Sequence, residues 1–458
     1  MLMQAFKNIS DRKYSLLNWF EFSLIILSSV LLGIWAAANT IALRNVLLIL
    51  GALLSIAYFY QLHCQNQLKQ YFGLRNSASL FCIIGLFLWV LAHCFLFPTD
   101  YPAQINELQS TWMRSALAAA VGVATGIAIA RNPSKIYWLW IGMILCFMYL
   151  LGQYLIDVWH MHKLFTERYM QYIFLGKVNG VLVGSILVSG VLGTSLSPIY
   201  EQSRHKISLG AIGIFTVILV LFSYLYILEA RNGFLVAMII IAIWCILEFK
   251  KITQALKLSK NSPFKKLLLI SLVIIIAIFA LIKHIERTPQ WLHLAEDISI
   301  SSQIDQYSTW QHAEDMGPPQ GKDGRYVSAN TYLRVAWITA GIKLIPESLL
   351  GHGVLHESFQ RALDNSSYLG AKVKSTHSAW LDFYFSFGFP GVLFTITPLL
   401  IAVFIKGMPL NLISPVRFLA TTVLLTFLIA EGTRQHPIEI LFFLIALLSA
   451  MSNIQEDR

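Results

Sequence analysis

The chain has 458 residues, of which 56% are hydrophobic and 13% charged, and its formal net charge at pH 7 is +10. A mean hydropathy of +0.63 excludes a soluble globular protein of this size, so the chain is predicted to be a membrane protein. The excess of lysine and arginine then reports membrane orientation and affinity for anionic membrane lipids, and no nucleic-acid partner is needed to explain it.

Long apolar segments predict an all-α polytopic fold with about twelve transmembrane helices. A bilayer core about 30 Å thick requires roughly 20 apolar residues per helix. Barrel strands are excluded because they alternate apolar and polar residues over about ten positions. The first segment lacks a small-residue cleavage site, so it is expected to remain as an anchor. The qualifying segments are 16–38, 41–62, 78–97, 113–130, 136–156, 177–197, 207–227, 232–248, 265–283, 378–404, 413–430 and 437–451.

Positive charges in the short loops predict which side of the membrane each loop faces. With twelve spans, Lys69, Arg131, Lys135 and six lysines between residues 250 and 266 all fall on one side. The positive-inside rule makes that side the cytoplasm.

One long polar segment is predicted to lie on the opposite side of the membrane. It divides the chain into residues 1–283 with spans 1 to 9, the loop 284–376, and residues 377–458 with spans 10 to 12. This loop is the only extramembrane piece large enough to fold.

Within the loop, residues 330–345 show the apolar spacing of an amphipathic helix, for instance at Leu333 and Trp337. Asn330 or Thr331 is expected to cap this helix, and a proline after it helps to end it. Its apolar face needs cover, so the helix is expected to lie on the membrane surface.

Two charges, Glu229 and Arg231, interrupt an apolar run near the external ends of spans 7 and 8. A charge at the bilayer centre costs at least about 2.5 to 3.5 kcal/mol on insertion scales, so a tolerated one usually faces a partner or a water-filled cavity. One interpretation is a structural pair of these residues, or an arginine that snorkels to the interface. The other is an arginine that receives an anionic group, most often a phosphate in a bilayer, because guanidinium offers a fixed fork of donors and stays charged.

Further arginines are predicted on the same external side. Arg334 lies on the surface helix, Arg325 nine residues earlier, and Arg434 in the last external loop, EGTRQHP. Several arginines therefore converge on one side of the membrane.

A histidine, His377, stands where the loop ends and span 10 begins, in STHSAWLDFYFSFGFPG. It is either an interfacial side chain among the headgroups or a general base that takes a proton from an attacking hydroxyl. His352 and His356 stand four apart, as metal ligands on a helix do. The glycines in GHGVLHE argue against a helix, and no HExxH motif follows, so no metal site is predicted. The glycines of FGFPG lie inside a span and predict a kink or close packing.

The order of these spans, the loop, the arginines and the histidine resembles the O-antigen ligase and O-antigen polymerase superfamily. This superfamily includes bacterial O-oligosaccharyltransferases that glycosylate pilins and other proteins. The matching pieces are ARNGFLVAM opening span 8, a large loop two spans later, YLRVAWITAGIKLIPESLLGHGV within that loop, and THSAWLDFYFSFGFPGVLF at its end. The resemblance covers about residues 207–405, and the remainder matches by span count.

The resemblance implies an enzyme of the bacterial inner membrane whose active site faces the periplasm. Such enzymes move a preassembled oligosaccharide from undecaprenyl diphosphate to an acceptor hydroxyl, with no metal, nucleotide sugar or other cofactor. By that resemblance His377 is the catalytic base, and Arg231 and Arg334 bind the diphosphate. Arg325 and Arg434, which are predicted on the same external side, are possible additional substrate contacts. The chain departs from many members in one place, where Ser378 stands in the position of an asparagine.

Several acceptors fit this chemistry. A ligase loads lipid A core, an oligosaccharyltransferase loads a serine or threonine of a pilin-like protein, and a polymerase extends the lipid-linked glycan itself. The length of the chain and of its loop favour a non-identical acceptor, lipid A core or protein. A polysaccharide transporter or flippase is the alternative of another class, but it usually shows repeated halves, and the sequence shows no repeat.

Overall fold

A computed structural model describes residues 2–72, 77–162, 174–198, 206–257, 264–312, 316–321, 324–368, 370–430, 432–433 and 435–453. Within these residues the chain is helical, and its β-structure is limited to two isolated bridges. The predicted all-α fold is therefore confirmed.

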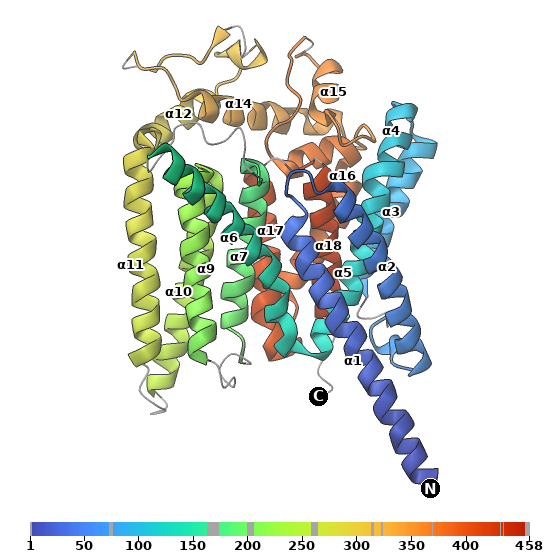
Figure 1. The fold of residues 1–458 in the computed structure, drawn as a ribbon. Helices are drawn as coiled ribbons and strands as arrows, with labels where there is room; N and C mark the ends of the chain where they lie inside the picture. The colour runs from blue at the N-terminus through green and yellow to red at the C-terminus, as the bar shows by residue number, and fades with distance from the viewer. Residues whose placement is uncertain are drawn as a thin grey trace.

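Long helices run side by side and form a bundle between two faces (Figure 1). Ten segments of the described chain are long and apolar enough to cross a membrane. The shorter apolar helix α18 and the helix α11 complete the predicted set. The long helices are α1 (Leu2–Ile34), α2 (Ile41–Cys64), α3 (Ala78–Leu96), α5 (Met113–Arg131), α6 (Ile136–Met161), α7 (Lys177–Ser195), α9 (Lys206–Phe222), α10 (Arg231–Lys257), α11 (Phe264–Arg287), α16 (Ala379–Phe404), α17 (Leu410–Ile429) and α18 (Gln435–Ser452).

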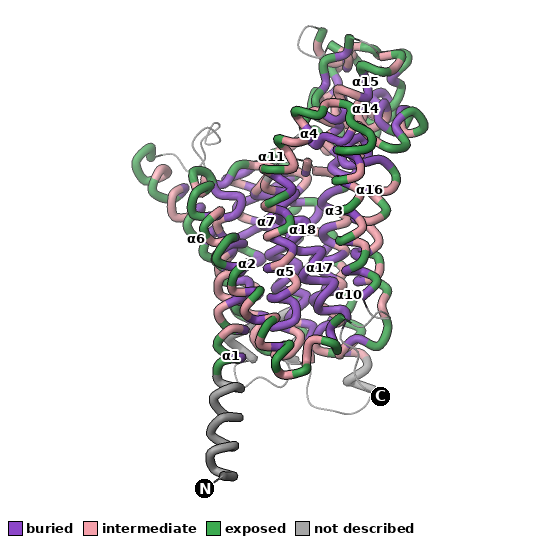
Figure 2. Tube along the Cα trace, turned by 90° about the vertical axis from the view of Figure 1, so that its right-hand side faces the viewer, coloured by how far each residue is buried: buried purple, intermediate pink, exposed green. Residues whose placement is uncertain are grey.

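The interior of the bundle is built around α18. Every residue from 441 to 450 is buried, and Figure 2 shows the buried chain concentrated in the middle of the bundle. Small residues on α5 permit close approach: a Cβ added to Gly126 would lie 2.7 Å from the Cβ of Ala450. On the outside, side chains such as Ile56 and Ile275 are exposed, as expected for helices that face lipid.

The bundle has two distinct faces. α1 begins and α18 ends at the terminus face, while the segment between α11 and α16 lies across the opposite, loop face (Figure 1). Short helices complete both faces: η1 (Leu68–Gln70), α4 (Tyr101–Glu107), η2 (Leu108–Trp112), η3 (Pro133–Lys135) and η5 (Ser223–Ile227).

The loop-face segment folds around a small core of its own, which includes Trp310, Tyr332 and Phe359. Its α14 crosses the ends of the spans, so the predicted helix is confirmed (Figure 1). Ala336, Ala340 and Leu344 on its apolar face are buried in the core of the loop segment itself, which supplies the cover that was expected from the membrane surface. Ser328 occupies the N-cap position of this helix without a side-chain capping bond, two positions before the predicted Asn330. The elements of this segment are η6 (Pro289–His293), α12 (Leu294–Ser301), η7 (Ser308–His312), α14 (Ala329–Leu344), η8 (Ile345–Glu347) and α15 (Ser358–Asp364).

The loop is joined to α16 at a break in that helix. Gly388 has φ of 66° and ψ of −165°, a non-helical conformation that glycine adopts readily. The backbone N–H of Gly353 donates to the carbonyl of Ser386 at 2.6 Å, on the turn before the break. A Cβ added to Gly351 would lie 2.5 Å from the nitrogen of Gly388. The predicted close packing at FGFPG is therefore confirmed.

Candidate active site

Arg231 is the first residue of α10 and is half-buried. The chain reaches it from α9 through the π-helical turn η5 and a tight connection in which Glu229 has a positive φ of 46°. Glu229 forms an ion pair with Arg287 of α11 at 3.5 Å. The alternative pair of Glu229 with Arg231 is absent from the ion pairs of the described residues.

Two further cations share the space around Arg231. Lys177 lies within electrostatic range of the acid Glu229 and of the cations Arg231 and Arg334. We call Lys177, Arg231 and Arg334 the cationic cluster. Lys177 is the first residue of α7, so α7 and α10 both begin here. A helix N-terminus carries a partial positive charge and exposed N–H groups, which repel a cation and attract an anion. Three cations and two helix N-termini therefore form a site suited to a phosphate group.

His377 lies against α14, next to the cationic cluster. Its imidazole stacks on the indole of Trp337, with ring centroids 5.2 Å apart and planes inclined by 14°. Trp337 follows Arg334 by three residues on α14, and residues at that spacing lie on the same side of a helix. The stack therefore places the imidazole over the side of α14 that also carries Arg334.

A buried carboxylate, Asp382, holds the chain around His377. It accepts hydrogen bonds from the Ser375 hydroxyl at 2.8 Å, the Thr376 N–H at 2.7 Å and the Thr376 hydroxyl at 2.8 Å. Asp382 lies in the first turn of α16, where a negative charge is favourable. His377 itself has a positive φ of 60°, a conformation that non-glycine residues keep only when their surroundings impose it. Asp382 supplies part of that constraint.

A polar cavity of about 850 Å³ opens beside this segment. One wall comes from α4, η2 and α5, another from residues 354–361, and Lys374 and Ser375 lead from it towards His377. The arginines and the lysine in its walls are paired: Lys374 with Glu357 at 2.7 Å, Arg361 with Asp100 at 2.8 Å and Arg114 with Glu439 at 2.7 Å. Such walls offer many hydrogen-bonding groups with little net charge, which suits a neutral, hydroxyl-rich molecule.

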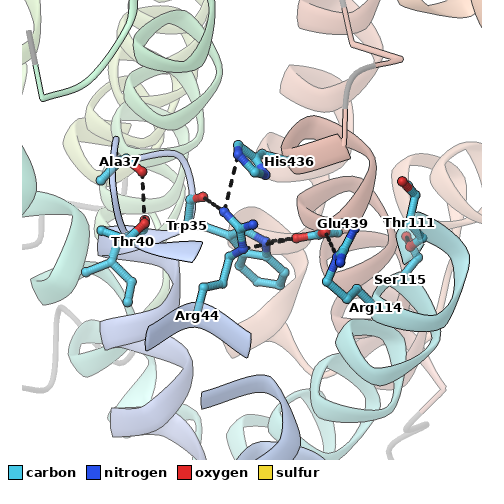
Figure 3. A network of polar contacts seen from close by, with 10 residues as sticks. Trp35, Ala37, Thr40, Arg44, Thr111, Arg114, Ser115, His436 and Glu439 are labelled. Atoms are coloured by element: carbon cyan, nitrogen blue, oxygen red, sulfur yellow. Dashed lines mark hydrogen bonds and ion pairs between the residues drawn. The ribbon is translucent and has the colours of Figure 1, made fainter. Parts of the chain in front are cut away.

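A second group of charges, the Glu439 network, lies at the ends of α2, α5 and α18 nearest the loop face (Figure 3). The buried Glu439 carboxylate accepts hydrogen bonds from Arg114 Nε at 2.7 Å and Trp35 Nε1 at 2.8 Å. The buried Arg44 lies 3.4 Å from the same carboxylate and donates to the Trp35 carbonyl at 3.0 Å. One acid thus joins two arginines from different helices.

The two remaining candidate arginines, Arg325 and Arg434, are not part of the cationic cluster. Arg325 forms ion pairs with Asp297 at 2.8 Å and Glu296 at 3.6 Å, which hold the start of the α14 segment to α12. Arg434 lies outside the described residues, although Thr433 before it lines the polar cavity.

The two histidines of GHGVLHE differ in exposure. His356 is largely exposed, whereas the His352 ring is half-buried, and burial and then the Arg361 charge lower its pKa. The described residues contain no group of three His, Cys, Asp or Glu side chains able to hold a metal.

Three residues of this site escaped the sequence analysis: Lys177, Trp337 and Asp382. Asp382 is a charge inside an apolar run, the same signal that drew attention to Arg231. Lys177 stands at the boundary of a span, where a lysine is unremarkable. Trp337 was seen as part of an apolar face, and its ring contact with His377 depends on the fold.

Comparison with known families bears on this site directly. A family model described as O-antigen ligase matches residues 215–396. The match supports the O-antigen ligase superfamily for this segment, which we call the O-antigen ligase domain. It contains Arg231, Arg334, His377 and Asp382, whereas Lys177 and the Glu439 network lie outside it.

The O-antigen ligase domain confirms the resemblance found in the sequence, and its family implies a glycosyltransferase-type membrane enzyme acting on glycans. No curated protein and no solved structure matches the chain significantly.

Proposed function

We propose that the chain transfers a preassembled oligosaccharide from undecaprenyl diphosphate to an acceptor hydroxyl. The observation that carries this proposal is the convergence of the cationic cluster with the stacked His377, inside the O-antigen ligase domain. Both groups lie at the end of a transmembrane bundle, the depth at which a lipid-linked headgroup lies.

The cationic cluster receives the diphosphate of the donor. When the bond between the sugar and the phosphate breaks, its electron pair leaves with the diphosphate, and negative charge grows on the phosphate oxygens. Fixed cations and helix N-termini in a water-poor site stabilise that charge without reorganisation. Arg231 and Arg334 suit this role because guanidinium binds two oxygens at once.

His377 receives the proton of the acceptor hydroxyl as the hydroxyl oxygen bonds to the anomeric carbon. Its place over the side of α14 that carries Arg334 puts the base next to the leaving group, and the backbone bonds around it fix its position. A neutral imidazole accepts a proton near neutral pH.

The polar cavity offers the acceptor a route to His377, through Ser375. A route separate from that of the donor favours an acceptor that differs from the donor. Such an acceptor is lipid A core or a serine or threonine of a pilin-like protein. Polymerisation of the lipid-linked glycan is the second candidate, since the same chemistry serves it.

The proposal requires the loop face to lie in the periplasm of a bacterial inner membrane. A reporter that is active only in the periplasm is expected to work when fused after Gln320 and to stay silent after Ser259. The opposite pattern would place the loop face in the cytoplasm, away from the glycan acceptor, and would contradict the proposal.

Deletion of the gene tests the function and identifies the acceptor. Lipopolysaccharide and pilin are compared on gels: lost O-chains indicate ligation to lipid A core, shortened ladders indicate polymerisation, and a faster pilin indicates protein glycosylation. Complementation with the wild-type gene serves as the control. Unchanged lipopolysaccharide and pilin in the deletion strain would contradict the proposal.

A further inference from the structure

A second cavity lies far from the candidate active site, between α10, the end of α16 and the start of α17. It has a volume of about 460 Å³. Because α16 ends and α17 begins at the terminus face, this groove belongs to the membrane leaflet on that side (Figure 1).

Most of the groove is apolar. Ile240, Ile243 and Leu247 of α10 form one wall, and Val403 and Phe404 at the end of α16 form another. Phe404 is 71% exposed and Leu247 36%, so the groove opens to the outside of the bundle. In a membrane that outside is occupied by acyl chains.

The end of the groove nearest the terminus face is positively charged. Lys406 follows α16, and Arg417 lies on α17. The Arg417 Nη2 donates to the Ile405 carbonyl at 3.0 Å, which holds the guanidinium beside the lysine. Its Nε is buried without a hydrogen-bond partner in the described part of the chain. The described residues that line the groove include two cations and no carboxylate.

We propose that this groove binds an anionic glycerophospholipid of the leaflet at the terminus face. The phosphate lies between Lys406 and Arg417, and an acyl chain follows the apolar walls along α10. Basic pockets between transmembrane helices bind anionic headgroups in this way. The volume suits a headgroup and part of one chain, since it falls in the range of small-ligand sites.

The bound lipid would touch the two helices that begin at the candidate active site. α10 starts at Arg231, and α16 starts two residues after His377. The lipid therefore joins the middle of α10 to the far end of α16, although its binding does not depend on the proposed transfer reaction.

Native mass spectrometry of the full-length protein in detergent tests the proposal. Dioleoyl phosphatidylglycerol and dioleoyl phosphatidylcholine are titrated separately, and apparent dissociation constants are compared. The wild type is expected to bind the phosphatidylglycerol more tightly. Lys406→Gln/Arg417→Gln should lose roughly fivefold in that preference for each cation removed, at about 1 kcal/mol per cation near the membrane surface.

Two further variants keep the test decisive. Lys69→Gln/Lys250→Gln removes two exposed cations from the same side of the bundle but outside the groove, and should keep the preference. Ile243→Trp fills the groove with both cations in place and should weaken phosphatidylglycerol binding.

Three outcomes would overturn the proposal. These are equal binding of the two lipids by the wild type, an equal loss in the Lys69/Lys250 variant, and undiminished binding by Ile243→Trp. Equal binding of the two lipids would indicate a nonspecific lipid surface. An equal loss in the Lys69/Lys250 variant would indicate a general effect of charge.

Discussion

The cationic cluster and the Glu439 network both contain cations at the ends of helices near the loop face. They differ in how deeply the neighbouring carboxylate is buried and in which cation it pairs with. In the network, the fully buried Glu439 carboxylate is shared by Arg44 and Arg114, so one acid holds two cations inside the protein. Near the cluster, the Glu229 carboxylate pairs with Arg287 instead. A buried acid shared by two arginines joins their helices, whereas the half-exposed Glu229, which is also within electrostatic range of Lys177, leaves the cationic cluster with an excess of positive charge.

The largest expected effect separates the two regions by stability. Glu439→Ala leaves buried arginine charge without its partner, which typically costs about 3 to 5 kcal/mol. We expect this variant to be lost from the membrane or to unfold at a much lower temperature, as measured by thermal unfolding in detergent. Glu229→Ala is the matched control, because its partly exposed pair with Arg287 contributes about 1 kcal/mol or less. Equal losses in the two variants would erase the distinction.

The next effect concerns activity in the cluster. Arg231→Ala and Arg334→Ala are each expected to lower transfer from a lipid-linked donor by roughly 100-fold to 1,000-fold, while the protein stays folded. Arg→Lys should rescue poorly, because a point charge does not reproduce bidentate contacts. Transfer is measured with purified protein in liposomes. Full activity in Arg231→Lys and Arg334→Lys would show that these residues only snorkel to the interface.

His377→Ala is expected to lower turnover by roughly 100-fold or more, within the range of general-base loss, while donor binding persists on the cationic cluster. Wild-type activity should also fall on acidification, since a protonated imidazole cannot accept a proton, and chelators should have no effect. His352→Ala and His356→Ala are the contrasting variants and should be mild. Joint collapse of donor binding and turnover in His377→Ala would make this residue a binding group, and inhibition by a chelator would revive the metal interpretation.

The smallest expected effect concerns Asp382, which positions the His377 segment without touching substrate. Asp382→Asn should lower turnover roughly tenfold, in line with about 1.5 kcal/mol for a hydrogen bond to a charged group. The donor dissociation constant should stay unchanged, as the cationic cluster is intact. Equal damage to donor binding and turnover would indicate general disorder of the loop face.

The sequence predicted the helical spans well because each span must satisfy its backbone and its lipid contacts locally. Arg231 and His377 were proposed as site residues for a related reason, since each breaks or borders an apolar run. The Glu439 network was not predictable in this way: Trp35 and Glu439 are 404 positions apart, and only the packing of Trp35, which follows α1, against α18 joins them. The start of α14 was displaced by two residues because apolar spacing marks the buried face of a helix rather than its first residue.

The junction of Gly351 with the break at Gly388 bears on how substrates reach the site. The loop is fastened there to a transmembrane helix, and Glu107 fastens it again by accepting the N–H groups of Leu355 and His356 at 2.7 and 2.8 Å. A cover held at two such points does not swing away as a unit. The lipid-linked donor is therefore expected to enter laterally from the bilayer, between the loop and the ends of the spans. Its hydrocarbon tail already confines its diffusion to the plane of the membrane.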